Sequence, residues 1–405
     1  MDQMNTELLS ARVKCLSESA TLEMTRRSRE LKEKGVDVIN LSIGEPDFNT
    51  PECIKDAGRK AIDNNFTHYT PVAGIPELRK AISAKLKRDN QLDYDPAQII
   101  VSNGAKQSIA NAMLCLLDPG DEVLIPSPYW VSYPEMAKMT GGKPVFLPAT
   151  IENNFKVTPQ QVEEAITPKT KIFIFSSPCN PSGSVYNRNE LNAIADVLKK
   201  YKNIFIISDE IYEYINFGGE HQSIAQFNDI KEQVIIVNGV SKGYAMTGWR
   251  IGYIAAPLPI AKACDTIQGQ YTSGASSIGQ KAALEAINTD PCGSDDIKKM
   301  VEAFRERRSL VIDLLNEIPG MKTNEPQGAF YIFPNVKYYF GKSKGDLMIA
   351  DSKDLCLYLL DKAHVATVPG AAFGNPACIR ISYATSNELL KEALRRIKKA
   401  LAELS

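Results

Sequence analysis

The stretch VIIVNGVSKGYAMTGWR, residues 234–250, joins an apolar run to a serine, a lysine and an arginine. Its first part is a continuous run of mostly β-branched residues, which is typical of a strand buried on both faces of a sheet. Similar runs occupy residues 99–104, 122–128, 143–149, 171–178, 203–210 and 250–257. Amphipathic helical stretches such as 190–201 separate several of them. The pattern predicts an α/β fold with a mainly parallel, seven-stranded sheet flanked by helices.

Polar and aromatic residues directly follow five of these strands. Ligands of open α/β sheets bind beyond the carboxyl ends of the strands, so we expect these residues to gather at one edge. They are Gly104, Lys106, Trp130, Asn180, Asp209, Tyr212, Ser241 and Lys242. This clustering favours a nucleophilic Lys242 over a solvated lysine in a turn.

The C-terminal third has a different pattern. A charged helical stretch over 294–317 is followed by the mixed strands GAFYIFPNV and CIRISYA and by a last helix. Thr385 and Glu388 have the spacing of a capping box for that helix. We expect a large domain over 51–290, a smaller α+β domain over 291–405, and an N-terminal segment, 1–50, that packs with the small domain.

Composition and charge exclude several classes of function. A net charge of -1 argues against nucleic-acid and anionic-membrane partners. The N-terminus lacks the apolar region of a secretory signal, and no apolar run reaches the roughly 18–20 residues that span a bilayer, so we expect a cytoplasmic protein. The eight cysteines form no CxxC pair and are expected to be buried thiols, and the three histidines stand in no metal-binding frame.

The residues at the strand ends suit one ligand in particular. A lysine is a covalent nucleophile toward carbonyls, with which it forms a Schiff base. An aspartate favours the protonated form of a pyridine nitrogen, and a tryptophan offers a face to a flat ring. A serine, an arginine and a glycine turn that opens a helix suit a phosphate. An aldehyde, a pyridine ring and a phosphate together describe pyridoxal 5′-phosphate. No GxGxxG motif follows a strand, which argues against a nicotinamide enzyme.

Seven stretches carry a resemblance to a known family: LSIGEPDFNTP, HYTPVAGIPELR, DPGDEVLIPSPYWVSYPEM, SSPCNPSGSVY, SDEIYE, SKGYAMTGWRIGY and IRISYATS. In this order they resemble the class I (fold type I) pyridoxal-phosphate-dependent aminotransferases, in particular the bacterial β-subgroup aspartate aminotransferases. The resemblance extends from about Arg12 to the end of the chain.

The resemblance implies a role for each matching residue. Lys242 would hold the cofactor as a Schiff base and move the proton between the substrate's Cα and the cofactor. Asp209 would face the pyridinium, Tyr212 and Asn180 the phenolic oxygen, and Trp130 the ring. The phosphate would lie against Ser241, Arg250 and the backbone of Ala105 and Lys106, with Tyr69 reaching the phosphate of the other subunit of a homodimer. Arg380 would bind the substrate's α-carboxylate, in a pocket that Gly44, Trp130 and Asn180 also line.

The expected reaction is transfer of an amino group between an L-amino acid, aspartate, and a 2-oxo acid, 2-oxoglutarate. Lys106, in the turn that opens a helix, is the candidate that selects a second carboxylate. One motif departs from the subgroup: where many members read KPSAT, this chain has SESAT, with Ser17 and Glu18 in place of the lysine and proline. The change argues against use of prephenate and weakens the case for acidic substrates.

Three alternatives remain open. An aromatic or broad-specificity 2-oxoglutarate-dependent aminotransferase fits the SESAT departure. A carbon–sulfur lyase fits the same cofactor and would release pyruvate from cystathionine. A non-catalytic regulator of this fold would need a DNA-binding segment ahead of residue 12, where the sequence leaves no room for one.

Overall fold

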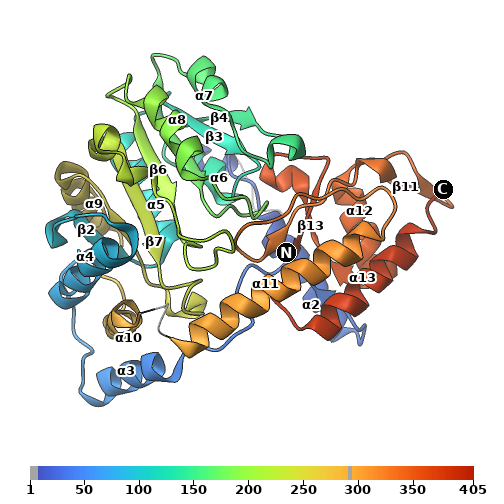
Figure 1. Ribbon diagram of the computed structural model, residues 1–405, viewed down its shortest axis with the longest axis horizontal. Helices are drawn as coiled ribbons and strands as arrows, with labels where there is room; N and C mark the ends of the chain where they lie inside the picture. Colours follow the sequence, from blue (N-terminus) through green and yellow to red (C-terminus); the bar gives the residue numbers. More distant parts are fainter. Residues whose placement is uncertain (1–7, 291–293) are drawn as a thin grey trace.

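The computed structural model describes residues 8–290 and 294–405. Its larger part is a sheet in the order β2-β8-β7-β6-β5-β3-β4 (Figure 1). The strands are β2 (Ile99–Ser102), β3 (Glu122–Ser127), β4 (Lys143–Pro148), β5 (Thr170–Ser176), β6 (Phe205–Asp209), β7 (Val234–Gly239) and β8 (Gly252–Ala255). Only β8 runs antiparallel to its neighbours. The predicted seven-stranded, mainly parallel sheet is confirmed.

Side-chain alternation along the strands explains why the runs are apolar throughout. Ile235 and Val237 of β7 pack with the helices of one face, whereas Val234 and Ile236 pack with those of the other. The first face is covered by α5 (Ala105–Leu116), α6 (Ser132–Met139) and α9 (Leu258–Tyr271), and the second by α4 (Pro76–Asn90), α8 (Arg188–Leu198) and α10 (Ser277–Asn288). Helices α3 (Glu52–Asp63) and α7 (Pro159–Ala165) complete this part. A strand covered on both sides has no solvent face and is therefore largely apolar.

The smaller part contains both ends of the described chain. Strand β1 (Ile39–Asn40) pairs in parallel with β12 (Val365–Ala366), so the N-terminal segment packs against residues from the far end of the sequence. A second sheet has the order β13 (Val368–Pro369), β14 (Ile379–Ser382), β9 (Tyr331–Ile332), and β10 (Ser343–Lys344) forms a hairpin with β11 (Leu347–Met348). Its helices are α2 (Ala20–Glu33), α12 (Ser352–Tyr358) and α13 (Asn387–Leu401), whereas the short helix α1 (Ala11–Lys14) contacts α6 of the larger part.

The long helix α11 (Asp295–Asn316) runs from beneath the sheet to the smaller part (Figure 1). Its bounds match the predicted charged stretch, and Ser294 and Glu317 flank it as caps. The predicted cap of the last helix is wrong by one residue. Ser386, not Thr385, accepts the hydrogen bond from Leu389 N, because Ser386 is the residue that directly precedes the first helical residue.

The cysteines are less uniform than expected. Among the described residues Cys179, Cys264, Cys356 and Cys378 are buried, Cys115 is half-buried, and Cys15 and Cys53 are exposed. The prediction of buried thiols is therefore wrong for the last two, which lie near the N-terminus and at the start of α3. No helix of the described chain has the length and apolarity that crossing a membrane requires.

Candidate active site

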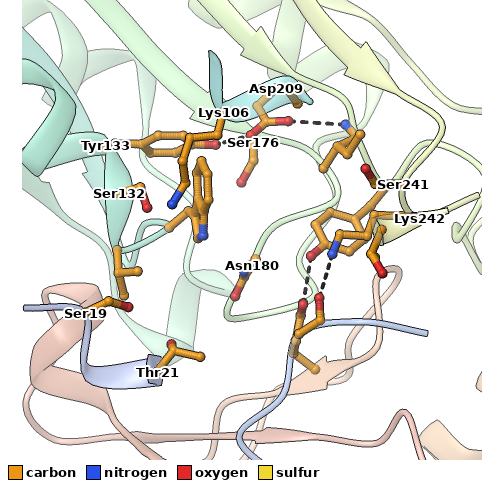
Figure 2. Close-up of a pocket in the computed structure, with 18 of the residues that line it drawn as sticks. Ser19, Thr21, Lys106, Ser132, Tyr133, Ser176, Asn180, Asp209, Ser241 and Lys242 are labelled. Carbon is orange, nitrogen blue, oxygen red and sulfur yellow. Dashed lines mark hydrogen bonds between the residues drawn. The ribbon is translucent and has the colours of Figure 1, made fainter. Parts of the chain in front are cut away.

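A cavity of about 450 Å³ opens at the carboxyl ends of the central strands (Figure 2). It is lined by eleven of the twelve predicted site residues: Gly44, Ala105, Lys106, Trp130, Asn180, Asp209, Tyr212, Ser241, Lys242, Arg250 and Arg380. They come from the ends of five strands, from the N-terminal segment and from β14. In Figure 2, Lys106 and Tyr133 lie on one side of the cavity, Lys242 on the other, and Asn180 between them.

Lys242 follows β7 and projects its amine into the cavity. Nζ donates a 2.5 Å hydrogen bond to the backbone oxygen of Gly44. Burial lowers the pKa of Lys242 to about 8; the nearby Glu45 opposes this shift, and Arg380 adds to it. A lowered pKa leaves a substantial fraction of the amine neutral near physiological pH, and the neutral amine is the form that attacks a carbonyl.

Asp209 is the last residue of β6 and is buried. Its Oδ2 accepts a 2.6 Å hydrogen bond from the hydroxyl of Tyr133, and Oδ1 accepts a longer one, 3.3 Å, from the backbone amide of Ile211. Burial raises the pKa of Asp209 to about 6, while both hydrogen bonds lower it. A buried carboxylate on the floor of a cavity suits a cationic ring nitrogen, since opposite charges stabilise each other.

An anion-binding cradle forms where β2 passes into α5. Gly104 caps this helix with φ +84°, and a Cβ on Gly104 would lie 2.2 Å from Nη2 of Arg250. The guanidinium of Arg250 donates to the backbone oxygens of Asn103 at 3.2 Å and Thr247 at 3.0 Å. The helix N-terminus at Ala105 supplies free backbone N–H groups. With Arg250 and Ser241 on the same cavity, the donors suit a phosphate.

Arg380 is a buried cation without an acidic partner. It lies on β14 and donates to Oδ1 of Asn180 at 3.0 Å and to the backbone oxygen of Ser42 at 2.6 Å. Its guanidinium carbon lies 4.7 Å from the ring centre of Tyr331, and Nε has no hydrogen-bond partner. Within residues 8–290 and 294–405 it forms no ion pair with a carboxylate. Burying a charge without an oppositely charged partner costs free energy unless a ligand anion binds to it.

Aromatic rings and a second lysine complete the cavity. The hydroxyls of Tyr212 and Tyr331 lie 2.8 Å apart. Nζ of Lys106 lies 5.0 Å from the ring centre of Trp130, and burial, followed by the charge of Arg250, lowers the pKa of Lys106. Lys106 thus places a second desolvated cation at the cavity.

Tyr69 is the one predicted site residue outside the cavity. Its side chain is 100% exposed in the single chain. Its predicted role depends on a second copy of the chain and stays a prediction.

The structure adds cavity residues that the sequence analysis did not single out. They are Ser19, Thr21, Leu22, Val131, Ser132, Tyr133, Ser176, Ile211, Thr247 and Tyr331. Ser176 and Tyr133 obey the strand-end rule that identified their neighbours, since Ser176 is the last residue of β5 and Tyr133 follows β3. Tyr331 had no local signal, because its place depends on how the smaller part packs on the sheet.

A group of acidic residues behind Asp209 has the composition of a metal site. Atoms of Glu210, Glu213 and His221 that could bind a metal lie within 4.8 Å of one another. Protein donors already bind both carboxylates: Lys85 and Asn238 donate to Glu213, and Ser223 donates to Glu210. We assign no metal to this group.

The donor set of the cavity fits pyridoxal phosphate. Gly104 leaves space beside Arg250 that a side chain would fill, the nucleophilic amine and the buried carboxylate share one cavity, and Arg380 retains an unpaired buried N–H.

Comparisons with known proteins agree with this fit. The family model for aminotransferase class I and II matches residues 36–397. The chain is 49% identical over 407 residues to the bifunctional aspartate aminotransferase and glutamate/aspartate-prephenate aminotransferase of Petunia hybrida, covering 100% of this chain and 85% of the relative.

Solved structures of aspartate aminotransferases also superimpose closely on this chain. The aspartate aminotransferase of Rhizobium meliloti superimposes with a TM-score of 0.94 at 43% identity, covering 98% of this chain and 99% of the other. The Thermus thermophilus aspartate aminotransferase with maleate superimposes with a TM-score of 0.90 at 40% identity, covering 97% and 99%.

Proposed function

The chain belongs to the class I and II aminotransferases, and from this membership we propose that it transfers the amino group of aspartate to 2-oxoglutarate. The observation that carries the proposal is the buried guanidinium of Arg380, whose Nε has no hydrogen-bond partner among the described residues, in the same cavity as the amine of Lys242. An amino acid binding there through its α-carboxylate has its amino group within the cavity that holds the nucleophile.

The cofactor is pyridoxal 5′-phosphate. When bound, it supplies an aldehyde that accepts the amino group and an electron-poor ring that delocalises the electron pair left at the substrate's Cα. In the proposal Ser241, Arg250 and the backbone at Ala105 hold the phosphate. Asp209 faces the ring nitrogen, and Trp130 stacks on the ring.

Lys242 has two tasks in the proposal. It would hold the aldehyde of the cofactor, for which its pKa of about 8 leaves enough neutral amine. With the substrate bound, Nζ would take the proton from the substrate's Cα and return it to the product. The hydroxyl of Tyr212 and the amide of Asn180 donate to the phenolic oxygen of the cofactor, which keeps the ring oriented during both steps.

Substrate selection divides between two cations. Arg380 and Asn180, which are already hydrogen-bonded to each other, bind the α-carboxylate next to Gly44. Lys106 binds the second carboxylate of aspartate, supported by its place on the cavity wall beside Trp130 and by its desolvation. The Thermus thermophilus relative holds the dicarboxylate maleate, in agreement with a dicarboxylate site.

A spectral titration tests the reaction. The yellow cofactor-loaded protein is mixed with aspartate, glutamate, phenylalanine or alanine, without an oxo acid, and the bound cofactor's absorbance is followed. Aspartate and glutamate should convert it to the amino form, and phenylalanine should not. If no amino acid produces the amino form, transamination is the wrong reaction.

A matched variant tests the role of Lys106. Lys106→Met should slow conversion by aspartate by roughly 10- to 100-fold, since it removes one charge-assisted hydrogen bond. Conversion by alanine, which has no second carboxylate, should be unchanged. An equal loss for both amino acids would instead place Lys106 on the cofactor phosphate.

A broad-specificity aminotransferase is the second candidate. The observation in its favour is that Ser17 and Glu18 are exposed beside Ser19, which lines the cavity. A negative charge at this rim opposes a dianionic substrate. Equal conversion rates for phenylalanine and aspartate in the same titration would favour this candidate.

The proposal includes a homodimer with shared active sites. It is supported by the full exposure of Tyr69 and by Tyr271, which is 72% exposed at the end of α9. A domain division near residues 50 and 290 is supported by the separate sheets, and a cytoplasmic location by the free thiols of the described cysteines.

A further inference from the structure

Tyr133 makes the shortest hydrogen bond to the carboxylate of Asp209. It lies in the first turn of α6, is 1% exposed, and donates from its hydroxyl to Oδ2 of Asp209 at 2.6 Å (Figure 2). The backbone amide of Ile211 donates to the other oxygen, at 3.3 Å. Tyr133 is thus the main hydrogen-bond donor to this carboxylate from the protein.

The surroundings keep the hydroxyl of Tyr133 protonated. Burial raises the pKa of Tyr133 well above its usual value, and the negative charge of Asp209 raises it further. Its oxygen therefore carries a hydrogen throughout the range in which the enzyme works, and that hydrogen points at Oδ2. An unshared donor of this kind stabilises the ionised form of a carboxyl group.

The charged groups around Asp209 do not keep its carboxylate ionised in both states of the site, whereas Tyr133 does. Glu210, the next residue in the chain, disfavours a negative charge on Asp209, whereas the more distant Lys242 favours it. Lys242 would be engaged in its covalent bond to the cofactor, so it could not offer a free ammonium group to Asp209 while the cofactor is held. The neutral hydroxyl of Tyr133 keeps its effect in both states.

We propose that Tyr133 is a positioning residue, whose hydroxyl holds Asp209 ionised and in one orientation against the ring nitrogen of the cofactor. The inference rests on the proposed function, because it assigns Asp209 to that nitrogen. The ring of Tyr133 has a separate packing role: it meets Trp130 edge-on, with ring centres 5.5 Å apart and planes at 86°. Tyr133→Phe removes the hydroxyl and keeps this packing.

The test compares two ligands on the full chain. One is pyridoxal phosphate, and the other is its carbocyclic analogue, in which a C–H replaces the ring nitrogen. Tyr133→Phe should weaken binding of pyridoxal phosphate roughly 10- to 100-fold, because a hydrogen bond to a charged group is lost. Binding of the analogue should not change, since it has no nitrogen for Asp209 to face. Equal weakening of both ligands, or of neither, would overturn the inference.

Controls separate this inference from the proposed function. Tyr129→Phe alters a neighbouring tyrosine whose ring stacks on Phe146 and which does not line the cavity, and it should leave both affinities unchanged. In an Asp209→Asn background, Tyr133→Phe should have no further effect on pyridoxal phosphate, and an additive loss would contradict the coupling. A wild-type chain that does not bind pyridoxal phosphate would refute the proposed function itself.

A second variant covers the case in which Tyr133→Phe does not fold. Fluorotyrosine at position 133 keeps the ring and the hydroxyl and makes the hydroxyl a stronger donor. It should tighten binding of pyridoxal phosphate relative to the analogue. An unchanged ratio of the two affinities would overturn the inference.

Discussion

Nζ of Lys242 donates its 2.5 Å hydrogen bond to the backbone oxygen of Gly44, which belongs to the N-terminal segment rather than to the sheet that carries the lysine. The nucleophile is therefore held by residues nearly 200 positions apart. In the proposed mechanism Lys242 would give up this contact on binding the cofactor, so the hydrogen bond to Gly44 would orient the amine only before that step.

Replacing Lys242 tests its chemical role. Lys242→Ala should lower the turnover rate by at least about 10³-fold, because the variant loses both the nucleophile and the group that moves the proton. Circular dichroism should show an unchanged fold. Lys242→Arg, which keeps a cation but not the nucleophile, should be equally inactive; activity in either variant would contradict the mechanism.

Arg380→Lys tests the carboxylate site. A lysine keeps the charge but cannot form the two parallel hydrogen bonds of a guanidinium, so KM for both the amino acid and the oxo acid should rise by roughly 10-fold or more. Steady-state kinetics with aspartate and 2-oxoglutarate measure this. Unchanged KM values would remove Arg380 from the substrate site.

Mixed dimers test the shared site. Subunits carrying Tyr69→Ala and subunits carrying Lys242→Ala should each have low activity when alone. After unfolding and refolding together, a mixed dimer has one site with neither change, and activity should reappear. If mixing restores nothing while each variant dimerises, Tyr69 does not serve the partner's phosphate.

Gly104→Ala tests the phosphate cradle against a matched control. Gly104 and Gly120 both have positive φ, +84° and +96°, so an alanine is strained at either position. Only at Gly104 does the added Cβ meet Arg250. Gly104→Ala should therefore weaken cofactor binding, measured by fluorescence titration, whereas Gly120→Ala should affect stability alone. Equal cofactor affinities in the two variants would contradict the cradle.

The stability of the cofactor-free protein should depend on pH in two windows. From pH 3.8 to about 6, folded Asp209 retains a proton that the unfolded chain has lost, so the free energy of unfolding falls as the pH rises. From about 8 to 10.5, the unfolded chain retains the proton that folded Lys242 has lost, and the free energy rises with pH. Each window spans on the order of 3 kcal/mol, since one pKa unit corresponds to about 1.4 kcal/mol.

Thermal melts of the cofactor-free protein at a series of pH values measure these windows. Asp209→Asn should flatten the lower window and Lys242→Met the upper one. Because buried tyrosines also titrate in alkaline solution, the difference between variant and wild type is the decisive quantity. If the melting temperature of a variant depended on pH in the same way as that of the wild type over the whole range, the assigned pKa shift would be contradicted.

The sequence predicted the central sheet well because burial on both faces leaves a plain apolar signal. Each predicted strand contains or closely overlaps an observed one, and the strand-end rule brought Asp209, Ser241 and Lys242 to one cavity. Two-residue strands such as β1 and β12 could not be predicted, since nothing local distinguishes Ile39 from a loop residue until it pairs with Val365.

The sequence analysis missed Tyr133 and Tyr331 for different reasons. Tyr133 follows the same strand as Trp130 and could have been found by extending the strand-end rule three residues beyond Trp130. Tyr331 depends on the packing of β9 beside Tyr212, which joins positions 119 residues apart. Thr385 and Ser386 are adjacent hydroxyl residues with the same capping chemistry, so the sequence alone does not decide which of them caps the last helix. The backbone decides, because Ser386 directly precedes the first helical residue.

The pairing of β1 with β12 has a consequence for how the protein is made. The large sheet is built from one continuous stretch, residues 99–255, and its contacts can form while the chain is still being synthesised on the ribosome. Ile39 is translated well before its partner Val365, which lies 326 residues further along the chain. The N-terminal segment, including Gly44 of the cavity, therefore cannot pair until Val365 has been made, and a chain truncated before residue 365 would lack a complete cavity even with Lys242 in place.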